Sequence, residues 1–181
     1  PTSLDVSVGA LASLASRHPD NREAIAKHIV SRLSSRMAMV GVGDGAVRVL
    51  RSISLLCVDS PQTQVAIAKA GGVPPLIMWL SGGFDARSFN ADAQQEAARA
   101  LLALVESNTP LQAFVAKSDG ILPLVELLSS KSALTTRECA ARALWHLAGD
   151  STLGLNIAEN GGIAPLAAML TVDDTHLQEL S

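Results

Sequence analysis

Apolar residues recur at three- and four-residue intervals along most of this chain, which is the spacing that places them on one face of an α-helix. Three stretches show the pattern most clearly: residues 44–58, 92–107 and 136–148. In the middle stretch, Ala97, Leu101 and Leu104 fall on the same side. The pattern therefore predicts three long helices, each with an apolar face that a neighbouring element must cover.

Shorter helical segments alternate with the long ones. The first kind covers residues 63–70, 111–118 and 153–160, and each ends near a glycine, the residue that most easily adopts the left-handed conformation of a helix cap. The second kind begins near Pro74, Pro123 or Pro165. Proline is tolerated in the first turn of a helix, because the N–H group that it lacks would have no partner there. The sequence thus predicts units of three helices, short, short and long.

These units form an internal repeat. Its three clear copies begin at Val49, Arg99 and Arg142. Gly72, Gly120 and Gly162 mark equivalent points, separated by 48 and 42 residues. Periods of about 40 to 47 residues are typical of HEAT and armadillo repeats. One such unit cannot bury its own apolar face, so the units are expected to stack.

The shared motif is a short helix, then GG(V/I)xPL, then LLxS and a loop, then EAARAL or CAARALWHLAGD. It resembles the armadillo repeat, the family of β-catenin and importin-α. The resemblance covers nearly the whole chain and implies an all-α, right-handed α-solenoid of three-helix units. It implies about three complete repeats in one domain, with partial repeats at both ends and approximate units 1–16, 17–58, 59–107, 108–149 and 150–181.

The two ends depart from the pattern. In unit 17–58, His28 stands where the glycine pair is expected, so the sequence does not predict the first turn of that unit. The chain is expected to open with the third helix of a repeat, at about residues 4–16, and THLQEL from Thr175 is expected to begin another. Apolar residues lie at these ends, where a solenoid needs polar caps: Leu4, Val6, Val8, Leu11 and Leu177. We expect flanking repeats or a partner chain to cover them.

Composition agrees with a helical class. Of 181 residues, 48% are hydrophobic and 17% are charged, as in folded chains, and three Phe, two Trp and no Tyr disfavour an aromatic-rich sheet. The net charge of −3 gives no argument for nucleic acid or an anionic membrane as a partner. The chain has neither an apolar run of about 20 residues nor a signal-peptide pattern. We expect an intracellular protein, cytoplasmic or nuclear, with no membrane insertion.

No set of residues indicates catalysis, a cofactor or a metal site. Cys57 and Cys139 lack CxxC spacing and are expected to act as small apolar residues in a reducing compartment. The four histidines have no metal-ligand spacing. The stretch VGVGDGA at residues 40–46 follows a helix and lacks the lysine of a phosphate loop. We therefore expect a protein without enzymatic activity.

Three arginines occupy one repeat position on successive third helices: Arg51, Arg99 and Arg142. The resemblance implies that third helices line a concave groove, and that importin-α carries a Trp at this position, which is absent here. Guanidinium groups suit carboxylates and phosphates. With Arg48 one turn earlier, the row predicts a site for an extended acidic or phosphorylated peptide, which resembles how β-catenin holds acidic tails.

The alternative is that the arginines are solvated or paired within their own helices. Glu96 precedes Arg99 by three residues and Glu138 precedes Arg142 by four, which are the spacings of helical ion pairs. Arg51 has no such neighbour. The sequence leaves both interpretations open.

Four further residues are candidate contacts: Trp145, His146, Phe84 and Phe89. Trp145 and His146 lie beside the arginine row, although Trp145 also fits packing between repeats, since Leu102 occupies its position in the preceding unit. Phe84 and Phe89 lie in a glycine-rich insertion and either fold back onto the solenoid or contact a partner. Trp79 is predicted to be a core residue.

Two functions follow, and both are non-enzymatic. The favoured one is a scaffold or adaptor whose groove binds an acidic linear segment of another protein. The alternative is a structural spacer or self-association module within a larger protein, which makes contacts through the solenoid ends or through the loop that carries Phe84 and Phe89. An importin-like carrier of basic signals ranks third, because arginines repel basic cargo.

Overall fold

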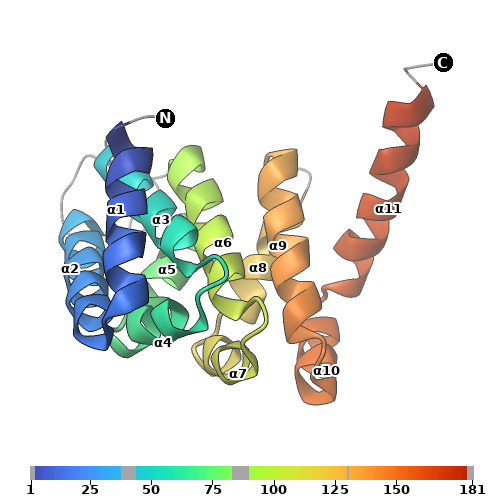
Figure 1. The fold of residues 1–181 in the computed structure, drawn as a ribbon. Helices are drawn as coiled ribbons and strands as arrows, with labels where there is room; N and C mark the ends of the chain where they lie inside the picture. The colour runs from blue at the N-terminus through green and yellow to red at the C-terminus, as the bar shows by residue number, and fades with distance from the viewer. Residues whose placement is uncertain (1–2, 38–43, 83–89, 130, 179–181) are drawn as a thin grey trace.

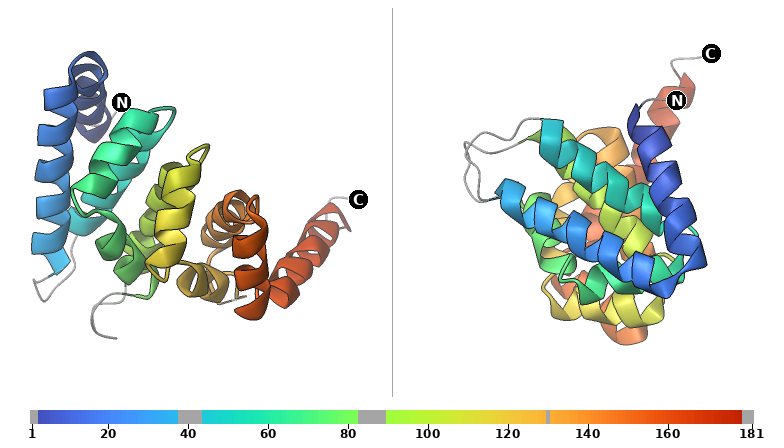
Figure 2. Two further views of the ribbon diagram at one scale, coloured as in Figure 1. Left: turned by 90° about the horizontal axis from the view of Figure 1, so that it is seen from below. Right: turned by 60° about the vertical axis from the view of Figure 1, so that its left-hand side comes forward.

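The computed structural model describes residues 3–37, 44–82, 90–129 and 131–178, which form eleven helices and no strand. Figure 1 shows the upright helices standing in a row, and Figure 2 shows the chain advancing in one direction from its N-terminal to its C-terminal helices. The expected all-α class and solenoid architecture are confirmed.

Two units have the predicted three helices. Their bounds are α4 (Pro61–Lys69), α5 (Val73–Leu80) and α6 (Ala91–Val105), then α7 (Thr109–Lys117), α8 (Ile121–Leu127) and α9 (Leu134–Leu147). The short helices α4 and α7 carry a proline in the first turn, and the side chain of Asn108 caps α7 by accepting from the Leu111 N–H. The sequence signals for these helices are local, and the predicted bounds agree to within two residues.

The third helices form one continuous layer. The helices α1 (Ser3–Arg17), α3 (Asp44–Cys57), α6 and α9 pack each against the next, while α5 packs against α6 and α8 against α9. In Figure 1, α4, α7 and α10 (Ser151–Glu159) lie along the lower edge. The core lies between the third helices and the shorter helices packed against them, and it includes Leu50, Leu101, Leu104 and Leu144. Trp79 is also buried in this core, as predicted.

The turn after each short helix differs in detail from the prediction. The left-handed residue is the one before the marked glycine: Gly71 with φ 85°, Asp119 with φ 60° and Gly161 with φ 79°. Gly72 and Gly120 themselves have right-handed helical backbones. They are needed for close approach, because a Cβ at Gly120 would lie 2.9 Å from the carbonyl oxygen of Val115 and 2.7 Å from its Cγ1.

Unit 17–58 has two helices where three were expected for a complete repeat. Residues that should form its first and second helices form one continuous helix, α2 (Pro19–Met37), which is followed by α3. The physical reason is the absence of the glycine pair at His28, since nothing there permits the close turn that Gly72 and Gly120 allow. The sequence did not predict the first turn of this unit, and the continuous α2 shows that no turn forms there.

The expectation of a new helix at Thr175 was wrong. The last helix, α11 (Ile163–Gln178), continues through this position without a break. At the other end, the predicted third helix at residues 4–16 corresponds to α1. Val8 is buried there and Val6 is exposed. The side chains of Leu4 and Leu177 lie outside those that the structure describes.

A buried polar network joins α4 to the C-terminal end of α6. The Gln64 side chain donates from Nε2 to the carbonyl oxygens of Ala103 at 2.8 Å and Cys57 at 3.3 Å. Its Oε1 accepts from Asn108 Nδ2 at 2.7 Å. Carbonyl groups at helix ends have no partner in their own helix, so Gln64 satisfies groups that burial would otherwise leave unpaired.

Candidate binding surface

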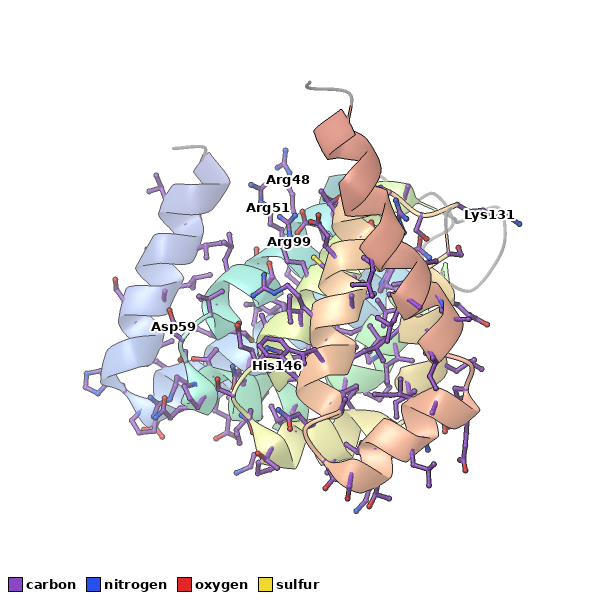
Figure 3. The ribbon with its side chains drawn as sticks, turned by 90° about the vertical axis from the view of Figure 1, so that its right-hand side faces the viewer. Arg48, Arg51, Asp59, Arg99, Lys131 and His146 are labelled. Atoms are coloured by element: carbon purple, nitrogen blue, oxygen red, sulfur yellow. The ribbon has the colours of Figure 1, made fainter. Side chains whose placement is uncertain are left out.

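The arginine row lies on the layer of third helices. Arg48 and Arg51 are exposed on α3, Arg99 is half-buried on α6, and Arg142 is exposed on α9. Figure 3 shows Arg48, Arg51, Arg99 and His146 on the same side of the ribbon, between α1 and α9. We call the surface formed by Arg48, Arg51, Arg99, Arg142 and His146 the third-helix face.

Two of the arginines make ion pairs. Arg99 Nη1 lies 3.6 Å from Glu96 Oε1, which is the intrahelical pair that the sequence spacing predicted. Arg142 Nη2 instead lies 3.5 Å from Glu106 Oε1, at the C-terminal end of α6. The predicted pair of Arg142 with Glu138 is therefore replaced by a contact between neighbouring repeats.

The charge available to a ligand thus varies along the face. Arg48 and Arg51 make no ion pair with any residue that the structure describes. At the other end, Glu106 Oε1 also lies 3.9 Å from His146 Nε2, so one carboxylate faces two basic side chains. Exposed ion pairs contribute only about 0 to 1 kcal/mol, so a multivalent anion can compete with the Glu106 contacts. The α3 end is the most open to an anion.

Glu106 was missed by sequence reasoning. It follows α6 at the C-cap, and its partner lies 36 positions along the chain on α9. No local spacing predicts such a pair, because it depends on the register of α9 against α6. The three-residue spacing of Glu96 and Arg99, by contrast, is visible in the sequence.

The other candidate contacts lie beside this face or outside the described residues. Trp145 is 72% exposed, and its ring centroid lies 5.1 Å from that of His146. It lies on the side of α9 that carries Leu134 and Ala141, and no described helix covers it there. Its repeat equivalent Leu102 is buried, as packing between repeats would predict. Phe84 and Phe89 lie outside the described residues.

Two pockets lie away from the arginine row. One of about 560 Å³ lies between α2 and α4, with Arg22, Val65 and Lys69 in its wall. The other, of about 290 Å³, lies between α9 and α11 and is lined mainly by apolar side chains. Neither pocket is lined by a residue of the third-helix face.

The two cysteines differ in environment. Burial raises the pKa of the Cys57 thiol to about 12, and burial also raises the pKa of Cys139, although the nearby Arg99 guanidinium opposes that shift. Because only the thiolate is nucleophilic, Cys57 is expected to resist a thiol reagent in the native state at pH 8. We predict that Ellman's reagent modifies Cys139 first, and that Cys57 reacts only after urea unfolds the chain. Equal rates for the two thiols in the folded protein would contradict this assignment.

Within the described residues, no three His, Cys, Asp or Glu side chains come together as a group that could hold a metal ion. No helix in the same ranges has the length and apolar character required to cross a bilayer.

Comparison with known proteins gives matches at the level of structure. No family model and no curated protein sequence matches the chain. Two engineered proteins solved by the Northeast Structural Genomics Consortium are similar, each with a TM-score of 0.73 and 26% identity. The matches cover 95% and 98% of this chain, and 40% and 70% of those proteins. This chain thus spans less than half the length of the first.

A third match is a designed armadillo repeat protein solved in complex with the peptide (KR)4. It has a TM-score of 0.72 and 17% identity, over 92% of this chain and 67% of that one. The helix order, the stacked third helices and these matches together show that the chain has the armadillo-type α-solenoid fold.

Proposed function

We propose that this chain is a non-enzymatic scaffold that binds an extended acidic or phosphorylated segment of another protein on its third-helix face. The observation that carries the proposal is the pair Arg48 and Arg51, which are exposed on α3 and make no ion pair within the described part of the chain. Arg99 and Arg142 extend this positive charge across the next two helices.

The chemistry of arginine supports an oxyanion ligand. A guanidinium group offers a planar set of N–H donors that match both oxygens of a carboxylate or phosphate. Arg48 and Arg51 are one helical turn apart, so both can reach one ligand segment. Since neither pairs with a carboxylate in the described part of the chain, binding at α3 breaks no ion pair there.

The spacing of the third helices also sets how long a ligand must be to reach from α3 to α9. Packed helices lie about 8 to 10 Å apart, so the path from α3 to α9 across α6 spans about 16 to 20 Å. An extended chain advances about 3.3 Å per residue. A segment of about six residues would therefore reach from Arg51 to Arg142.

A basic ligand is the competing possibility, because the similar designed protein was solved with (KR)4. On this chain the third-helix face presents four arginines, which would repel such a peptide. Two carboxylates beside it, Glu96 and Glu106, already face arginines. The charge of the face therefore favours acidic segments.

The test compares binding of labelled hexaglutamate and of (KR)4 by fluorescence anisotropy at low salt. We expect hexaglutamate to bind, and the double variant Arg48→Glu, Arg51→Glu to weaken binding by at least about tenfold, equivalent to about 1.4 kcal/mol. The control is Lys117→Glu, Lys131→Glu, which changes the same charge at exposed sites elsewhere; Figure 3 shows Lys131 far from the arginines. Arg99 and Arg142 are left intact because their reversal would disturb Glu96 and Glu106.

Salt provides a second readout. Binding through exposed charges should weaken as ionic strength rises, because the Debye length falls from about 30 Å at 0.01 M to about 10 Å at 0.1 M. Preference of the wild type for (KR)4, or equal loss of hexaglutamate binding in the control variant, would reject the proposal.

A further inference from the structure

The pocket between α2 and α4 is a second candidate binding site, and it shares no residue with the third-helix face. The two helices pack directly against each other. The motif AIAK recurs at residues 24–27 and 66–69, so equivalent stretches of the repeat line the two walls. The volume of about 560 Å³ lies within the roughly 300 to 1,000 Å³ that is typical of ligand pockets. The pocket therefore has the size of a ligand site.

Part of the pocket wall is apolar. The apolar residues are Pro19 of α2 and Pro61, Val65, Ala66 and Ala70 of α4. Val65, Ala66 and Ala70 are each half-buried, so part of their surface remains in contact with water. Removing apolar surface from water is favourable. An apolar side chain of a ligand would therefore be stabilised against this wall.

The remaining wall is charged, apart from Gln62, and its charge is mainly positive. Arg22 and Lys27 of α2 and Lys69 of α4 are basic, and Glu23 is the acidic residue among those that line the pocket. Lys27 Nζ lies 2.6 Å from Glu23 Oε1, so these two charges offset each other. Neither Arg22 nor Lys69 makes an ion pair with a residue that the structure describes. Two positive charges are thus available to a ligand.

Charges on the two helices act on the same space. The pKa of the Glu23 carboxyl lies below its ordinary value, first because Lys27 hydrogen-bonds to it and attracts it. Lys69, on the facing helix, lowers the pKa of Glu23 further by attraction. A carboxylate of a ligand between the two helices would meet the same attraction from Lys69. The pocket therefore combines an apolar wall with a site for an anion.

We propose that the pocket between α2 and α4 binds a short extended segment of a partner protein that carries both apolar and acidic side chains. The apolar side chains lie against Val65 and Ala66, and a carboxylate lies near Arg22 and Lys69. This ligand differs from the one proposed for the third-helix face, because it needs apolar side chains as well as acidic ones. The two sites can therefore be tested separately.

The shape of the pocket favours a peptide of about four residues. On α4 the wall extends from Pro61 to Ala70. At about 1.5 Å per helical residue, this wall is about 13 Å long. An extended chain advances about 3.3 Å per residue, so about four residues match the length of the wall.

The test is an amide chemical-shift titration with the peptide LLEE, acetylated and amidated so that its ends carry no charge. Peptide concentrations up to about 5 mM detect contacts with dissociation constants of about 1 mM. We expect LLEE to bind, with the largest changes in residues 61–70. SSEE lacks the apolar side chains and LLKK has the opposite charge, so each should bind at least about fivefold more weakly. Equal binding of SSEE and LLEE would overturn the proposal, because charge alone would then explain it.

Single substitutions test the two parts of the wall. Lys69→Glu should weaken LLEE binding by at least about fivefold, because it reverses a charge that faces the ligand. The control Lys117→Glu should leave LLEE binding unchanged. Both lysines are exposed in the last turn of a short helix, so the two reversals have similar effects on folding. Val65→Ala introduces the residue that the next repeat has at Ala113, and it should weaken binding by about threefold.

The variant Arg48→Glu, Arg51→Glu separates this proposal from the proposed function. It should weaken the binding of hexaglutamate and leave the binding of LLEE unchanged. Two results would overturn the pocket proposal without affecting the third-helix face. One is the absence of changes at residues 61–70 when LLEE is added, and the other is an equal loss of LLEE binding in Lys69→Glu and Lys117→Glu.

Discussion

Replacing Gln64 by alanine is expected to lower the free energy of unfolding by about 3 kcal/mol. Gln64 is 3% exposed and joins α4 to the end of α6 through its bonds to Ala103 and Asn108. Each buried group that loses its partner costs about 1 to 3 kcal/mol. Urea denaturation followed by circular dichroism measures the change.

The chain offers a graded control for this prediction. Gln112 occupies the same place in the next repeat and donates one bond, to the Val105 carbonyl at 2.9 Å. Its replacement by alanine should cost less, about 1 to 2 kcal/mol. Gln62 is exposed, and its replacement should change stability by less than about 0.5 kcal/mol. If all three variants were equally stable, the network would not hold the repeats together.

Adjacent substitutions in the turn between α7 and α8 are expected to change stability in opposite directions. Gly120→Ala should destabilise by about 2 kcal/mol, because its Cβ would lie 2.9 Å from a backbone oxygen that cannot move freely. Asp119→Gly should stabilise by as much as about 1 kcal/mol, because Asp119 has φ 60°, where glycine has no steric penalty.

Thermal unfolding distinguishes the two effects. For a chain of this size, 1 kcal/mol corresponds to about 2 to 4 °C in Tm, so Gly120→Ala should unfold several degrees below the wild type and Asp119→Gly above it. A Tm for Gly120→Ala equal to that of the wild type would contradict the close approach at Gly120, and a lower Tm for Asp119→Gly would contradict the steric penalty assigned to the left-handed backbone of Asp119.

The two complete units were predictable because their signals are local. Helices α4, α5 and α7 have a proline in the first turn, α6 begins at the capping residue Asn90, and the apolar residues of these helices follow the helical period. Where the signal is absent, the sequence predicted no turn: without the glycine pair at His28, α2 continues as one helix. The left-handed residue at Asp119 was not predicted either, because glycine adopts this backbone more easily than aspartate and Gly120 stands beside it.

The candidate surface was only partly predictable. The sequence placed Arg51, Arg99 and Arg142 at one repeat position, and it identified Glu96 as a partner of Arg99. It did not identify Glu106, because the pair with Arg142 depends on how two repeats pack against each other. For the same reason the sequence did not predict which arginines make no ion pair with a described residue. The location of those arginines determines where an acidic ligand competes least with carboxylates of the chain.

The most direct test of the proposed function is to map where an acidic peptide binds. In amide chemical-shift titrations with hexaglutamate, we predict the largest changes in α3 around Arg48 and Arg51, with smaller changes near Arg99 and Arg142. (KR)4 should leave these signals unchanged. Changes confined to residues 61–70, beside the pocket between α2 and α4 that carries Arg22 and Lys69, would contradict the account, because the peptide would then bind without the third-helix face.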